Sequence, residues 1–175
     1  MNSLFVAIPV PLPIKKTIER LCYGLPDASW IEPSNCYIIL APFGSIDGTT
    51  KLDIQEKLKN IKWCPPFLIK LSSIGYSKNA LWINAAPSEW LVLLKKTIDA
   101  AMEDLPFEHA RKPFAPQIPL AHFEKMDPAK LGDYLYANKD FETLPFAVEN
   151  LLLVESQITQ RQRKISIEHA KFPLG

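Results

Sequence analysis

The segments Pro33-Ser-Asn-Cys-Tyr-Ile-Ile-Leu40 and Pro113-Phe-Ala-Pro-Gln-Ile-Pro-Leu120 resemble each other and begin 80 residues apart. In each segment a proline precedes a polar residue by four positions, and isoleucine, a variable residue and leucine follow. A helical pattern comes after each segment, and a strand hairpin comes later. This order of elements, repeated after about half the chain, predicts a duplicated fold with two lobes.

Side chains alternate between the two faces of a strand, so residues two positions apart share a face. Tyr37 and Ile39 therefore point the same way, as do Gln117 and Pro119. If the two segments are equivalent strands of two lobes, these pairs face each other across a cleft. A cleft between related lobes is a common place for a binding site.

The sequence pattern predicts an α+β fold. Apolar, β-branched runs indicate strands, and apolar residues at helical spacing indicate helices. The expected strands lie near 3–10, 36–42, 67–74, 80–84, 114–123, 146–157 and 164–168, and the expected helices near 14–25, 51–61, 88–105 and 128–138. Short turns between strands imply antiparallel pairing. We therefore expect one domain, 1–175, with two intertwined, pseudo-duplicated lobes: antiparallel sheets flanked by helices around a central cleft.

The same spacing predicts which side chains are buried. The side chains expected to face the core from two helices and one strand are Leu52, Ile54, Leu58, Ile61, Leu91, Leu94, Ile98, Met102, Trp82 and Trp90.

Composition excludes several classes of protein. Hydrophobic residues make up 47% of the 175 residues and the net charge is +1, so the chain is not a disordered one. The balanced charge gives no general attraction to nucleic acid or to an anionic membrane. Three widely spaced cysteines indicate reduced thiols and no zinc site. Without a signal-peptide pattern or a long apolar run, we expect a soluble, cytoplasmic monomer that needs no metal or cofactor.

Five stretches together resemble the two-histidine (2H) phosphoesterase superfamily, in its branch of 2′-5′ RNA ligases and RNA 2′,3′-cyclic phosphodiesterases. They are Leu4-Phe-Val-Ala-Ile-Pro-Val-Pro11, Trp30-Ile-Glu-Pro-Ser-Asn35, Lys112-Pro-Phe-Ala-Pro116, Leu153-Val-Glu-Ser-Gln-Ile-Thr159 and Phe172-Pro-Leu174. The triplet Glu155-Ser156-Gln157 after an apolar strand is the most specific of these features. The resemblance spans nearly the whole chain and implies the bilobal fold of that family.

The resemblance also implies where catalytic groups would lie. Members of the family carry one His-x-Thr-x motif in each lobe; one histidine acts as general base and the other as general acid, and the threonine hydroxyls bind phosphate. Here the two motifs read Tyr37-Ile-Ile-Leu40 and Gln117-Ile-Pro-Leu120. Tyr37 and Gln117 thus stand at the catalytic positions, and Ile39 and Pro119 stand at the phosphate-binding positions.

None of these replacements supplies the original chemistry. Tyrosine ionises only near pH 10, and glutamine does not titrate. Isoleucine and proline have no hydroxyl, and Ala41 stands where the family often has arginine. Loss of one general acid or base typically costs roughly 10²–10⁴-fold in rate. The main hypothesis is therefore a protein that has lost cyclic phosphodiesterase activity and retains a cleft for a nucleotide or RNA end.

Two other hypotheses remain open. An active enzyme would need Tyr37 together with His122, which lies five residues beyond Gln117 and faces away from the cleft unless a bulge occurs near Pro119. A non-catalytic module for a protein partner would fit a closed, apolar cleft with Ile39 and Pro119.

Several further residues are weaker candidates for a site. Trp30 precedes the first motif and is a candidate for stacking on a base, although packing is the simpler interpretation. Ser156 is a candidate for a hydrogen bond within the cleft. Arg161, Arg163 and Lys164 would suit RNA phosphates but fit a solvated turn better. His109 and His169 are expected in a loop and in solvent, respectively.

Overall fold

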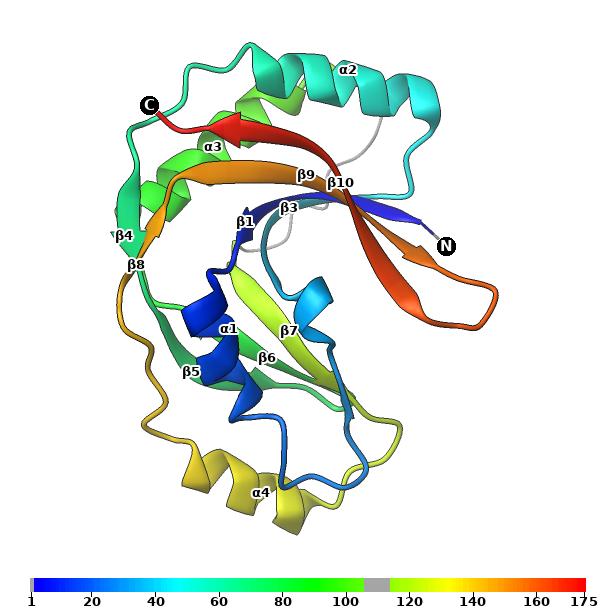
Figure 1. Ribbon diagram of the computed structural model, residues 1–175, viewed down its shortest axis with the longest axis vertical. Helices are drawn as coiled ribbons and strands as arrows, with labels where there is room; N and C mark the ends of the chain where they lie inside the picture. Colours follow the sequence, from blue (N-terminus) through cyan, green and yellow to red (C-terminus); the bar gives the residue numbers. More distant parts are fainter. Residues whose placement is uncertain (1, 106–113) are drawn as a thin grey trace.

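The computed structural model describes residues 2–105 and 114–175 (Figure 1). Within them the elements are β1 (Ser3–Pro9), α1 (Leu12–Glu19), β2 (Ser29–Trp30), a 3₁₀ helix η1 (Pro33–Asn35), β3 (Tyr37–Gly44), α2 (Gly48–Lys59), β4 (Phe67–Ile69), β5 (Leu71–Tyr76), β6 (Ala80–Ala85), α3 (Glu89–Met102), β7 (Gln117–His122), α4 (Pro128–Ala137), β8 (Phe146–Val148), β9 (Asn150–Ile158) and β10 (Lys164–Pro173). Helices combine with sheets whose paired strands are antiparallel, which confirms the predicted α+β class.

One large sheet runs in the order β10-β9-β1-β3-β7-β6-β5, with β2 added beside β7. Its centre is narrow, because β3 and β7 are joined by one residue pair, Ile39 with Gln117. We call this junction the seam. It divides the sheet into a first half (β10, β9, β1, β3) and a second half (β7, β6, β5, β2), and a separate two-stranded sheet, β4 with β8, lies beside them. In Figure 1, α2 and α3 lie with the first half and α1 and α4 with the second.

Most of the helix side chains that the sequence predicts to be buried are buried in the structure. Leu91, Leu94, Ile98 and Met102 of α3 are all buried, as their spacing predicts. In α2 the prediction for Leu52 is wrong, because its side chain is 66% exposed. The buried side chains of α2 are Thr50, Ile54 and Leu58, which are four residues apart and therefore share one helix face.

The strand predictions hold with local changes. The expected strand near 67–74 is two strands, β4 and β5, in different sheets. Between the helix expected near 14–25 and the strand expected near 36–42, where the sequence predicted neither a strand nor a helix, the structure has the short strand β2 and the 3₁₀ helix η1. The helix expected after Asp127 is confirmed, since the Asp127 carboxylate accepts a hydrogen bond of 2.9 Å from the Ala129 N–H.

Glu155 in β9 is the centre of a polar cluster that connects β9 with β10 and with α2. Its side chain is nearly buried; Nε2 of His169 lies 2.7 Å from Oε2, and Nζ of Lys51 lies 3.4 Å from the same oxygen. The register shift between Glu168 and Ala170 in β10 places His169 there, so the expectation that His169 is solvated is wrong. Burial acts to raise the pKa of Glu155, but His169 and Lys51 outweigh it and the pKa is lowered.

We expect the Glu155→Gln substitution to lower the free energy of unfolding by about 1–3 kcal/mol near neutral pH, because it removes a buried hydrogen-bonded charge. Since the pKa of Glu155 is lower in the folded than in the unfolded state, its ionised form stabilises the fold above the unfolded pKa. That stabilisation is lost as the pH falls through the folded pKa. Urea denaturation of the wild type and of Glu155→Gln should therefore show that the difference between their free energies of unfolding becomes smaller as the pH is lowered.

The control for this experiment is Glu149→Gln, because Glu149 is exposed. We expect this variant to follow the wild type across the pH range. A Glu155→Gln effect that is equally large at every pH would contradict the assignment of the stabilisation to the ionised carboxylate.

Candidate functional site

The seam brings the four motif positions onto one face of the sheet. Ile39 and Gln117 are directly paired, so their side chains lie on the same side. Tyr37 and Pro119 are two residues away on their own strands and share that side. We call the surface formed by Tyr37, Ile39, Gln117 and Pro119 the motif face. The expectation that Tyr37 and Ile39 face Gln117 and Pro119 across a cleft is wrong, because the two pairs are neighbours on adjoining strands.

Tyr37 is packed into an apolar cluster on the first half of the sheet. Its side chain lies with Phe5, Ala7, Leu152 and Val154, and its ring meets Phe5 edge-on at 6.2 Å. The hydroxyl donates a hydrogen bond of 2.9 Å to the Glu168 carboxylate. Burial, followed by this hydrogen bond, raises the pKa of Tyr37 to about 12. At neutral pH the hydroxyl therefore keeps its proton and does not serve as a base.

Three further contacts fasten β10, and the turn just before it, to the segment that leads into β3. Arg163 forms an ion pair of 2.9 Å with Glu32. The Asn35 amide donates to the Lys164 carbonyl at 3.1 Å, and the Ser166 hydroxyl donates to the Asn35 amide oxygen at 2.6 Å. Together with the hydrogen bond from Tyr37 to Glu168, these contacts form a strap. The first motif position is therefore part of a structural connection between β3 and β10.

The second half of the motif face is polar and aromatic. Gln117 pairs with Asn84 of β6, and Pro119 pairs with Trp82. The Trp82 indole N–H donates to the Asn84 amide oxygen at 3.1 Å, and the Asn84 amide donates to the Ser73 hydroxyl at 3.1 Å. The prediction that Trp82 belongs to the core is wrong: its neighbours Leu81 and Ile83 are buried, whereas Trp82 is half-buried on the opposite, motif face.

His122 does share the motif face. The register of β6 and β7 shifts between Leu81 and Trp82, which leaves an extra residue in β7 next to Pro119. Such a bulge reverses the alternation, so His122 points to the same side as Gln117. Five residues of strand nevertheless separate the two side chains by roughly 16 Å. His122 lines a separate open hollow of about 760 Å³.

The remaining sequence candidates lie in different places. Ser156 is buried in β9, two residues from Val154, and so belongs to the motif-face side of the first half. Trp30 pairs with the buried Ala121 and packs on Tyr134 of α4 at a ring distance of 6.0 Å, on the core side of the sheet. Trp90 is 45% exposed and stacks on Phe67, so its predicted burial is wrong. His109 lies outside the described residues.

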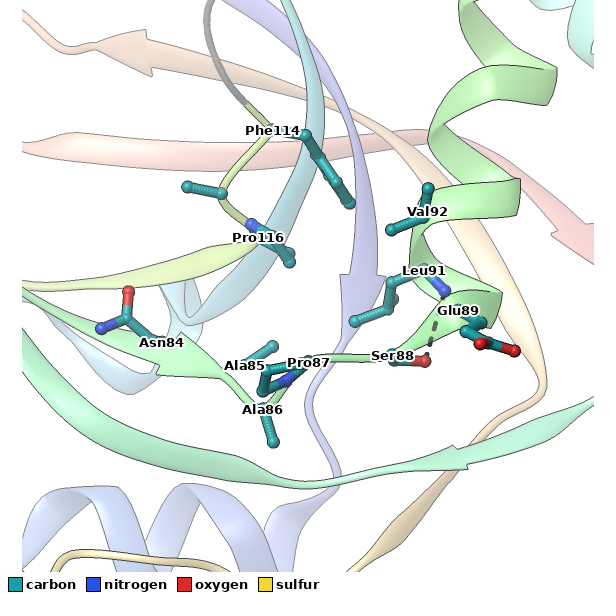
Figure 2. Close-up of a pocket in the computed structure, with 11 residues that line it drawn as sticks. Asn84, Ala85, Ala86, Pro87, Ser88, Glu89, Leu91, Val92, Phe114 and Pro116 are labelled. Atoms are coloured by element: carbon teal, nitrogen blue, oxygen red, sulfur yellow. Dashed lines mark hydrogen bonds between the residues drawn. The ribbon is translucent and has the colours of Figure 1, made fainter.

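A pocket of about 640 Å³ opens beside the seam and was not predicted from the sequence. It lies where the chain passes from β6 into α3 and where it enters β7 (Figure 2). Figure 2 shows the apolar side chains of Leu91, Val92, Phe114 and Pro116 around it. Asn84, at its edge, connects the pocket with the motif face, since Asn84 pairs with Gln117.

Within the described ranges, no group of three or more His, Cys, Asp or Glu side chains is placed to hold a metal ion. Cys22, Cys36 and Cys64 are free thiols, and burial raises the pKa of each. None of the helices that the structure describes is both long enough and apolar enough to span a membrane.

The sequence matches no protein-family model and none of the curated proteins, but its structure matches solved ones. E. coli LigT complexed with 3′-AMP superposes with a TM-score of 0.79 at 17% identity, covering 99% of this chain and 98% of LigT. The chain has the LigT fold. TT0787 of Thermus thermophilus gives a TM-score of 0.81 at 19% identity, covering 98% of this chain and 97% of TT0787.

A third match is the MHV ns2 PDE domain, with a TM-score of 0.63 at 12% identity over 87% of this chain and 97% of that domain. LigT has also been crystallised with ATP and with NADP⁺. The fold that the sequence predicted, including its α+β class, is thus confirmed as the LigT fold.

We expect Tyr37→Phe to lower the free energy of unfolding by about 1–2 kcal/mol, because it leaves the Glu168 carboxylate without the Tyr37 donor. The difference in ultraviolet absorption between wild type and variant during an alkaline titration should show Tyr37 ionising at a pH near 12. Tyr23→Phe is the matched control, since Tyr23 is 74% exposed. Unchanged stability, together with ionisation near the ordinary tyrosine pKa, would show that Tyr37 is not held by Glu168.

Proposed function

We propose that this protein binds a nucleotide or an RNA end at the motif face and does not hydrolyse it. The observation that carries the proposal is the state of Tyr37, which is buried, hydrogen-bonded to Glu168 and raised in pKa. Gln117, at the second catalytic position, has no titratable proton. Cleavage of a cyclic phosphate needs one group that takes a proton and one that gives it, and neither position supplies such a group near neutral pH.

The phosphate-binding positions support the same proposal. Ile39 and Pro119 have no hydroxyl, and Ile39 packs against the apolar cluster that contains Tyr37. A developing negative charge on phosphate needs hydrogen-bond donors or cations directed at it. Apolar side chains at these positions favour a neutral portion of a ligand over a reacting phosphate.

Nucleotides are the first ligands to test because of the LigT structures. LigT was crystallised with 3′-AMP, ATP and NADP⁺, and all three ligands contain adenosine joined to phosphate. In the present chain, the half-buried amides of Gln117 and Asn84 and the indole of Trp82 offer partners for such a molecule. We therefore propose an adenine nucleotide as the probe.

An active phosphodiesterase is the second candidate, because the bulge in β7 turns His122 to the motif face. A separation of roughly 16 Å along the strand from Gln117 is too great for one phosphate to contact both His122 and the seam. The enzymatic candidate therefore requires a site at His122 that is independent of the seam.

The test incubates the protein with adenosine 2′,3′-cyclic phosphate and measures 3′-AMP binding by calorimetry. We expect no turnover above the uncatalysed rate, together with saturable binding of 3′-AMP. Turnover that disappears in Tyr37→Phe or Gln117→Ala would overturn the non-catalytic proposal, and turnover that disappears only in His122→Ala would support the second candidate. If 3′-AMP and uridine 3′-monophosphate both fail to bind at millimolar concentration, nucleotide binding is excluded and a protein-partner role is favoured.

A further inference from the structure

We infer that Trp82 is a stacking platform for the base of the bound nucleotide, with the amides of Asn84 and Gln117 at the edge of the base. The inference rests on the proposed function and assigns its ligand contacts to particular residues. Trp82 and Asn84 pair with Pro119 and Gln117, so all four side chains lie on the motif face of the second half of the sheet. The other motif strand, β3, carries Tyr37, which packs in the apolar cluster and belongs to the strap. Trp82 and Asn84 lie on the other side of the seam.

The indole of Trp82 is held flat on the sheet. Gly75 of β5 pairs with Trp82, and a Cβ added to Gly75 would lie 2.1 Å from indole Nε1 and 2.4 Å from Cε2. The ring therefore occupies the space directly above the Gly75 backbone. Only glycine at position 75 leaves room for the Trp82 ring there. The Gly75 backbone covers one face of the ring, and the Trp82 side chain as a whole is still partly exposed. A ring fixed in this way loses little conformational entropy when a base stacks on it.

A chain of hydrogen bonds fixes the side of the platform nearest the seam. The Trp82 indole N–H donates to Asn84, and Asn84 donates to the Ser73 hydroxyl. Ser73 has φ +65°, a left-handed conformation that is unfavourable for residues other than glycine. A strained backbone conformation persists only where the surrounding contacts hold it in place, and such residues are often found at binding sites. The Asn84 amide has a second N–H and a second lone pair on its oxygen, and these are able to bond a ligand.

The chemistry of these groups selects a base over other ligands. Every nucleobase has a flat π face that stacks on an indole, and its edge carries donors and acceptors that match side-chain amides. Trp82, Pro119, Asn84 and Gln117 are all uncharged, so they suit a neutral, planar ligand better than phosphate. Asn84 also borders the pocket of about 640 Å³ in Figure 2, which provides space next to the platform.

The experiment measures 3′-AMP affinity for the wild type and for Trp82→Leu, Trp82→Phe and Asn84→Ala by calorimetry. Stacking on one aromatic residue typically changes affinity by roughly 10- to 100-fold, so Trp82→Leu should weaken binding by that factor. Trp82→Phe keeps an aromatic ring and should weaken binding less. Ribose 5-phosphate, which has no base, should bind the wild type and Trp82→Leu equally weakly. Trp90→Phe is the control, because Trp90 stacks on Phe67 away from the motif face.

Circular dichroism and urea denaturation show first that each variant is folded. Equal 3′-AMP affinity in wild type and a folded Trp82→Leu would overturn the platform while leaving the proposed function standing. Equal affinity of the wild type for 3′-AMP and ribose 5-phosphate would also overturn it, because the base would then make no contribution. Failure of 3′-AMP to bind the wild type would instead overturn the proposed function, and the platform with it.

Discussion

The backbone pairing of Ile39 with Gln117 is the constraint on which the rest of the site depends. It joins two half-sheets at one residue pair, and pairing between strands determines which side chains share a face. The motif positions are therefore held together by the backbone, whatever side chains occupy them. The chain shares the LigT fold at 17% identity, which fits a site arrangement that is set by backbone pairing.

The two halves have taken different roles on that shared face. In the first half, Tyr37 is fixed by Glu168 and by an apolar cluster, so its side chain contributes to packing. In the second half, Trp82, Asn84 and Ser73 form a connected hydrogen-bonded row with a half-buried indole. The proposed ligand contacts are consequently confined to the second half, and the first half borders them at the seam.

The sequence predicted what depends on regular periodicity. The inward face of α3, the α+β class and the common face of Tyr37 and Ile39 all follow from fixed helix and strand repeats. Several errors arise where the repeat is interrupted, whereas Trp82 and Trp90 were expected in the core although they lie off the buried faces of their elements. Bulges changed the positions of His122 and His169, and a helix face set by Thr50 and Ile54 left Leu52 outside. Glycine at position 75, which gives Trp82 room on the sheet surface, shows its effect only once β5 and β6 are paired.

The position of β1 has a consequence for how the protein is made. This strand lies between β3 and β9, and β10 pairs with β9 at the edge. Strand β1 therefore lacks one of its two neighbouring strands until β9 has been translated. Tyr37 likewise lacks its hydrogen-bond acceptor Glu168, which lies 131 positions later in the sequence. The strands β5 and β6 form a hairpin that needs no such delay. Assembly of the first half therefore requires that β9 and β10 have been synthesised, and contacts between such distant residues generally slow folding.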